Sequence, residues 1–73
     1  MLGQTVASYE TLSDRELEVL KLIAAGESLV DIARRLRLSP HTVTTYRTRI
    51  LEKIGVSGNA KLAVYALEHG LLN

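Results

Sequence analysis

Residues 39–54 have apolar side chains at the spacing of a helix with one packed face. At 3.6 residues per turn, the apolar residues share one side: Val43, Tyr46, Ile50 and Ile54, with Leu51 at its edge. The opposite side carries short polar or charged residues: His41, Thr44, Thr45, Thr48, Arg49 and Glu52. Ser39 is a suitable N-cap, and Pro40 suits the first helical position because its missing N–H would be unpaired there. The pattern predicts a helix that packs on one face and presents the other.

Two capping patterns precede this helix. Ser13 and Glu16 fit a capping box, so a helix is predicted to begin after Ser13, and Gly26 is its left-handed C-terminal residue. Its predicted apolar stripe is Leu17, Leu20, Ile23 and Ala24, widened by Val19. Ser28 and Asp31 predict the start of a second helix in the same way. The buried side of that second helix is predicted to be Leu29, Ile32, Ala33 and Leu36, with Arg34 and Arg35 outside.

The connections between the helices are short. Residues 37–39 leave room only for a tight turn, so the second and third helices must cross steeply, as in a helix-turn-helix. Gly55 ends the third helix, and a fourth is predicted from residue 59 or 60 to His69, with Gly70 as its stop. That helix has more apolar residues than one packing stripe needs: Ala60, Ala63, Val64, Ala66 and Leu67.

No strand alternation interrupts this pattern, so the prediction is an all-α domain of four short helices. Residues 1–10 show no sustained period and are predicted to be a tail or linker, with Tyr9 and Leu12 folding back onto the first helix. The chain has 73 residues and no Cys, which excludes a disulfide framework and fits a cytoplasmic protein. No apolar run approaches the length of a membrane span, and no signal peptide is evident.

The net charge of +1 conceals an uneven distribution. Residues 1–31 hold six acidic and two basic residues, whereas residues 32–53 hold six basic residues and one acidic residue. Residues 54–73 are neutral overall. A basic block around one helix is typical of a surface that binds a phosphate backbone. A merely solvated face is the alternative.

The exposed side of the third helix is suited to DNA. Thr44, Thr45 and Thr48 each offer a hydroxyl and a methyl to base edges or phosphates, and Arg49 could reach guanine or phosphate. The predicted phosphate contacts are His41 and Thr42 in the first turn, Arg47 and Lys53 at the rim, and the Tyr46 hydroxyl. Apart from its hydroxyl, Tyr46 is predicted to be a core residue. The alternative interpretation of the three threonines is that they are exposed helix residues with no role in binding.

Catalysis and metal binding have little support in the chain. His41 and His69 are far apart in sequence, and neither has a carboxylate arranged near it. With no Cys, no Ser with a suitable His and acid, and no glycine-rich phosphate loop, we expect no enzyme activity, no cofactor, no metal and no small-molecule substrate.

The order of these residues resembles the LuxR-type (GerE-like) helix-turn-helix domain, the DNA-binding output domain of NarL/FixJ-type response regulators. The matching stretches are LSDRELEVLKLIAAGES at 12–28, DIARRLRLSPHTV at 31–43, ILEKIGV at 50–56 and AVYALEHGLL at 63–72. Within the family, TVTTYRTRILEKI looks most like the BvgA-type branch. The resemblance implies a winged-helix-superfamily fold without the wing, in which residues 11–73 form the domain and residues 29–48 form the helix-turn-helix.

The resemblance also implies roles for individual residues. Groove-facing positions fall on Thr44, Thr45 and Thr48, and backbone-contacting positions on Thr42, Tyr46 and Arg49. The fourth helix would mediate dimerisation on DNA, through Ala60, Ala63, Val64 and Leu67. The chain departs from the common pattern at Leu29-Val30-Asp31, at Thr44-Thr45-Tyr46 and at Asn59, where Arg is usual. We expect these departures to leave the fold and DNA binding intact and to change which base sequence is recognised.

The expected partner is therefore double-stranded DNA with promoter half-sites, bound by a homodimer, with RNA polymerase as a candidate further partner in the cytoplasm or nucleoid. Two alternatives stay open: a module similar to sigma-factor domain four, and a protein–protein interaction module whose third helix docks an acidic partner.

Overall fold

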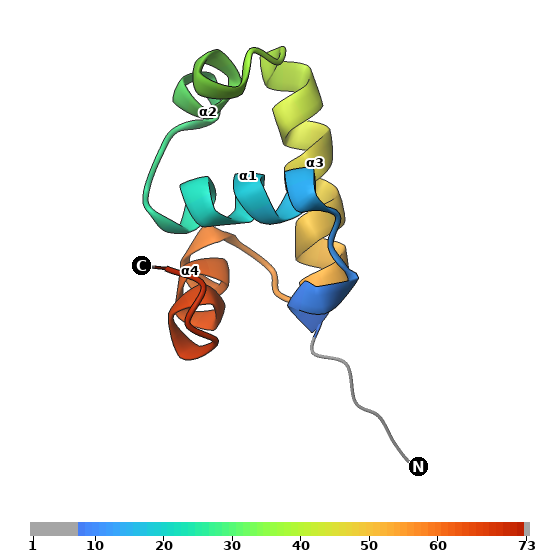
Figure 1. The fold of residues 1–73 in the computed structure, drawn as a ribbon, viewed down its shortest axis with the longest axis vertical. Helices are drawn as coiled ribbons and strands as arrows, with labels where there is room; N and C mark the ends of the chain where they lie inside the picture. Colours follow the sequence, from blue (N-terminus) through green and yellow to red (C-terminus); the bar gives the residue numbers. More distant parts are fainter. Residues whose placement is uncertain (1–7, 73) are drawn as a thin grey trace.

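A computed structural model describes residues 8–72, which form four α-helices and one short 3-10 helix and contain no strand. The elements are η1 (Ser8–Thr11), α1 (Asp14–Ala24), α2 (Leu29–Leu36), α3 (Pro40–Ile54) and α4 (Asn59–Glu68). In Figure 1, α1 crosses the long α3, with α2 on one side of α1 and α4 on the other. The all-α, four-helix prediction is confirmed.

The first helix begins and ends at the predicted signals. Ser13 Oγ accepts the Glu16 N–H at 3.1 Å, and Glu16 Oε1 accepts the Ser13 N–H at 2.8 Å, which completes the capping box. At the other end, Gly26 has φ +92°, and the Glu27 N–H reaches back to the Leu22 carbonyl at 3.1 Å. Left-handed glycine with this hydrogen bond is a common helix terminator.

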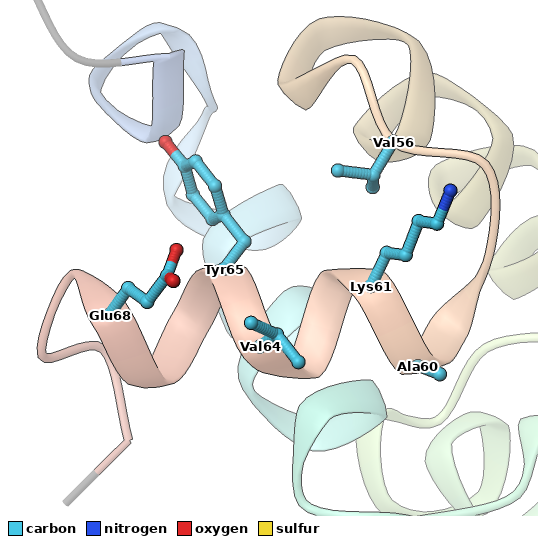
Figure 2. Close-up of a pocket in the computed structure, with 6 residues that line it drawn as sticks. All are labelled: Val56, Ala60, Lys61, Val64, Tyr65 and Glu68. Carbon is cyan, nitrogen blue, oxygen red and sulfur yellow. The ribbon is translucent and has the colours of Figure 1, made fainter.

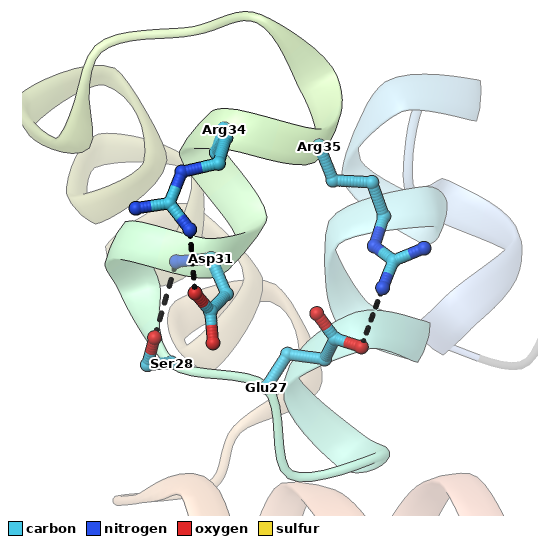
Figure 3. A network of polar contacts seen from close by, with 5 residues as sticks. All are labelled: Glu27, Ser28, Asp31, Arg34 and Arg35. Atoms are coloured by element: carbon cyan, nitrogen blue, oxygen red, sulfur yellow. Dashed lines mark hydrogen bonds and ion pairs between the residues drawn. The ribbon is translucent and has the colours of Figure 1, made fainter.

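The second cap is only half of the predicted box. Ser28 Oγ accepts the Asp31 N–H at 3.1 Å, but the Asp31 carboxylate pairs with Arg34 at 3.4 Å (Figure 3). The side chain of Asp is one methylene shorter than that of Glu, so it does not reach the backbone of the capping residue. The helix still begins where predicted, because the Ser28 cap is formed.

The turn of the helix-turn-helix is made by a residue in an unusual conformation. Arg37 has φ +60° and ψ +43°, and the Leu38 N–H donates to the Ala33 carbonyl at 2.9 Å. Ser39 then caps α3 by accepting the Thr42 N–H at 3.1 Å, with Pro40 in the first helical position. The predicted turn and cap are confirmed.

The core is built around α1, which packs against α2, α3 and α4. Its buried apolar residues are Val19, Leu20, Ile23, Ile32, Ala33, Val43, Ile50, Ile54, Leu62 and Ala66. In α1 the prediction was partly wrong, because Val19 is fully buried, whereas Leu17 is only half-buried and lies outside this cluster. Positions 16, 19, 20 and 23 form one helical face, and Leu17 lies beside it.

The start of the described chain, η1, packs against α3 and is bonded to α4 through Tyr9. The Tyr9 N–H donates to Tyr65 Oη at 3.0 Å, and the Tyr9 ring lies against His69 with a centroid distance of 5.5 Å. His69 in turn stacks on Tyr65 at 4.2 Å. Tyr9 was expected to fold back on the first helix, and its bonded partners lie instead in and just after α4. Residues 1–7 of the predicted tail lie outside the described residues.

Candidate nucleic-acid interface

The polar face of α3 is open to solvent, as predicted. His41, Thr44, Thr48 and Arg49 are exposed, and Thr42, Thr45, Tyr46 and Arg47 are half-buried. Val43 and Ile50 are fully buried on the opposite face, so the orientation of α3 about its own axis is fixed by the core. The helix therefore presents its threonine and arginine side chains outward.

Four of the predicted contact residues surround one hollow. Thr42, Thr45, Tyr46 and Arg49 line a depression of about 220 Å³ on the surface of α3. Their spacing of three and four residues places them along one side of the helix. A hollow that joins two hydroxyl-bearing threonines, a phenol and a guanidinium can accommodate a base edge or a phosphate.

The first turn of α3 is occupied mainly by its own cap. Ser39 Oγ accepts the Thr42 N–H and lies 2.9 Å from Thr42 Oγ1. Pro40 has no N–H, so within residues 8–72 the His41 amide is the first-turn donor without a partner. That amide and the positive end of the helix dipole can still favour a phosphate.

The cations of the basic block are largely engaged within the protein. Arg34 pairs with Asp31 at 3.4 Å, and Arg35 pairs with Glu27 at 2.9 Å (Figure 3). Such exposed pairs contribute little stability, and Arg34 keeps 77% of its side chain exposed. The pairing nevertheless lowers the net positive charge that this part of the surface presents.

Two predicted phosphate contacts on α3 also have partners. Arg47 Nε donates to Asn59 Oδ1 at 2.7 Å, which ties α3 to the first residue of α4. Lys53 Nζ donates to Glu16 Oε1 at 2.9 Å, in an ion pair that sequence reasoning missed. No local sequence pattern predicts this ion pair, since its two residues are 37 positions apart in the chain. Among residues 8–72, Arg49 makes no hydrogen bond or ion pair, so its guanidinium is available to a ligand.

Glu16 is the one buried charged residue among those described, at 4% exposure. The hydrogen bond from the Ser13 backbone N–H is the largest cause that lowers its pKa, followed by the hydrogen bond from Lys53. Burial acts in the opposite direction, because it disfavours the charged carboxylate. Glu16 therefore stays ionised and links the cap of α1 to the last turn of α3.

The apolar excess predicted for α4 is exposed in part. Val64 is 54% exposed and Leu67 is 69% exposed, whereas Leu62 and Ala66 are fully buried. Ala60 and Val64 line an open groove of about 300 Å³, together with Val56, Lys61, Tyr65 and Glu68 (Figure 2). Ala63 is half-buried and does not line the groove. The groove is thus a surface feature of α4, separate from the polar face of α3.

Within residues 8–72 no group of three or more His, Cys, Asp or Glu side chains could hold a metal ion. None of the described helices has the length and hydropathy needed to cross a membrane.

Comparison with known proteins identifies the family. The family model described as "Bacterial regulatory proteins, luxR family" matches residues 10–66. The response regulator UvrY of Escherichia coli K12 is 37% identical over 70 residues, which cover 96% of this chain and 32% of that protein. The response regulator GacA of Pseudomonas aeruginosa is 38% identical over 65 residues, which cover 89% of this chain and 30% of that protein. The chain spans about a third of the length of these relatives. With more than half of its residues matched by the family model, this chain belongs to the luxR family of bacterial regulatory proteins.

Proposed function

We propose that this chain binds double-stranded DNA sequence-specifically, as the DNA-binding domain of a transcriptional regulator. The observation that carries the proposal is the open polar face of α3, held outward by the burial of Val43 and Ile50 and preceded by a tight helix-turn-helix turn. A helix held in this way fits the major groove, which is wide enough to admit an α-helix. Membership of a family of regulatory proteins supports the same function.

The proposed contacts divide into two kinds. Base edges are read by Thr44, Thr45, Thr48 and Arg49, and the free guanidinium of Arg49 supplies the strongest donor. Phosphates are contacted by His41, Thr42, Tyr46, Arg47 and Lys53. Lys53 keeps two of its three N–H donors beyond the bond to Glu16, and Arg47 keeps its terminal amino groups beyond the bond to Asn59.

We further propose that two copies associate through α4 on a pair of half-sites. The exposed Val64 and Leu67 and the groove beside Ala60 support this assignment, and Ala63 would lie at the margin of the contact. Exposed apolar side chains next to one another often mark an interface between proteins.

The chain is proposed to be the output domain of a longer response regulator. Its relatives carry that name and are about three times its length. Residues 11–73 would form the domain and residues 1–10 the connection to the preceding part, in a cytoplasmic protein that acts at promoters with RNA polymerase.

Selection from a pool of random duplexes, followed by sequencing of the bound fraction, tests the proposal. We expect enrichment of a repeated half-site, and a broadened or lost preference for Thr45→Ala. Binding that vanishes with added salt and enriches no sequence would reflect backbone attraction alone and would contradict the proposal. An acidic protein partner for α3 would then be the leading alternative.

A further inference from the structure

The three threonines on the exposed side of α3 share one hydrogen-bonding arrangement. Thr44 Oγ1 donates to the Pro40 carbonyl at 3.1 Å, and Thr48 Oγ1 donates to the Thr44 carbonyl at 3.1 Å. Thr45 Oγ1 donates to the His41 carbonyl at 3.2 Å. Each hydroxyl therefore bonds the backbone four residues earlier in its own helix.

This arrangement decides what the threonines can offer to a ligand. A hydroxyl has a single O–H donor, and in all three residues that donor is directed at a helix carbonyl. The groups left for a partner are the γ-methyl and the lone pairs of Oγ1. Donation to a guanine O6 or N7, or to a phosphate oxygen, would first require the helix bond to break.

We infer that Thr44 and Thr48 read thymine methyl groups rather than donating hydrogen bonds. Both side chains are exposed, and the C5-methyl of thymine is the apolar group that the major groove displays. The lone pairs of the two Oγ1 atoms can in addition accept from the amino group of adenine. On this face, guanine would then be recognised by the N–H groups of Arg49. The inference rests on the proposed DNA binding and specifies its preferred bases.

The spacing of the two threonines adds a geometric expectation. Thr44 and Thr48 are separated by about one helical turn, or about 6 Å along the axis. Base pairs are stacked about 3.4 Å apart, so the two methyls reach bases about two steps apart when α3 runs along the groove. We expect the enriched half-site to contain thymines at such a separation.

Replacing thymine by deoxyuridine in the enriched duplex tests the inference, because it removes one methyl and leaves base pairing unchanged. Each position is replaced in turn, and affinity is measured by fluorescence anisotropy. At a thymine read by Thr48, we expect the wild-type dissociation constant to rise about fourfold, the effect of one buried methyl-sized group. Thr48→Val keeps a methyl and should show the same loss. Thr48→Ser lacks the methyl and should be insensitive to the replacement.

Thr11→Ser is the matched control, because Thr11 also donates its hydroxyl to a backbone carbonyl, that of Ser8 at 2.7 Å, but lies in η1. It should respond to deoxyuridine as the wild type does. Specific binding that is unaffected by every deoxyuridine replacement would overturn the inference and leave the proposed function standing. Equal sensitivity of Thr48→Ser and wild type would also overturn it. If the chain enriches no DNA sequence, both the proposed function and this inference are overturned.

Discussion

Lys53 Nζ lies 2.9 Å from Glu16 Oε1, and this contact joins the last turn of α3 to the first turn of α1. The same carboxylate oxygen accepts the Ser13 N–H at 2.8 Å, so one buried group both caps α1 and holds α3. The angle at which α3 crosses α1 is thereby linked to a charged pair as well as to apolar packing. A side chain predicted to contact phosphate thus also has a structural role.

Glu16→Gln isolates the charged part of this contact, because glutamine can still complete a capping box. We expect the free energy of unfolding to fall by about 1–2 kcal/mol, because a hydrogen bond to a charged group contributes about 1.5–3 kcal/mol and a neutral one about 0.5–1.5 kcal/mol. Urea denaturation followed by circular dichroism measures the change. The matched control is Glu18→Gln, which removes the exposed pair with Arg15 and should change stability by less than about 0.5 kcal/mol. Equal effects of the two substitutions would contradict the structural role of Glu16.

The stability of the domain should depend on pH through Glu16. Its pKa is lowered in the folded protein, chiefly by the Ser13 backbone N–H, so the unfolded chain binds this proton more readily. The stabilisation is present above the usual glutamate pKa of about 4.3 and is lost as the pH falls through the lower folded pKa. As the pH is lowered from 7 to 3, the urea midpoint of unfolding should fall less steeply for Glu16→Gln than for the wild type. Parallel curves would show that other carboxylates govern the acid response.

Arg37→Gly should stabilise the helix-turn-helix. Arg37 has φ +60°, a conformation that costs a non-glycine residue about 1–2 kcal/mol. Glycine removes that strain but also makes the unfolded chain more flexible, so the expected net gain is about 0.5–1 kcal/mol. Gly55→Ala is the converse test: φ is +84° and a Cβ would meet no neighbour, so any loss reports conformation alone. A loss of stability for Arg37→Gly, measured by thermal unfolding, would mean that the arginine side chain stabilises the turn.

Leu67→Asp and Val64→Asp test association through α4. Both side chains are more than half exposed, so the substitutions should leave the melting temperature nearly unchanged. We expect affinity for a duplex with two half-sites to drop at least tenfold, while affinity for one half-site is retained. Ala25→Asp is the matched control, since Ala25 is exposed but lies at the end of α1, outside the helix-turn-helix. Equal losses on one and two half-sites would place these residues in the DNA contact or the fold instead.

Local signals in the sequence predicted most of the fold. The serines at positions 13, 28 and 39 cap the starts of α1, α2 and α3, and the glycines at 26 and 55 follow the ends of α1 and α3. Hydrophobic periodicity likewise predicted which face of α3 is buried. These features depend on neighbours along the helix, so a sequence pattern contains them.

Contacts between distant residues could not be predicted in this way. The partners of Lys53 and of Tyr9 depend on how the helices pack, and nothing near either residue identifies Glu16 or Tyr65. In α1, the period alone did not distinguish Leu17 from Val19 as the core residue. The hydroxyl directions of the threonines also depend on side-chain rotamers. The assignment of individual DNA contacts and the similarity to the BvgA-type branch stay predictions.

The most direct test of the central claim compares the affinity of the purified chain for its enriched duplex with that for a shuffled duplex of equal length and composition. Fluorescence anisotropy at 150 mM salt gives both dissociation constants. We expect the enriched duplex to bind at least about a thousandfold more tightly, the lower bound for specific recognition. Arg49→Ala should reduce that ratio, because a base contact is lost, whereas Lys21→Ala, outside the basic block, should leave it unchanged. Equal affinity for the two duplexes would contradict sequence-specific recognition by α3.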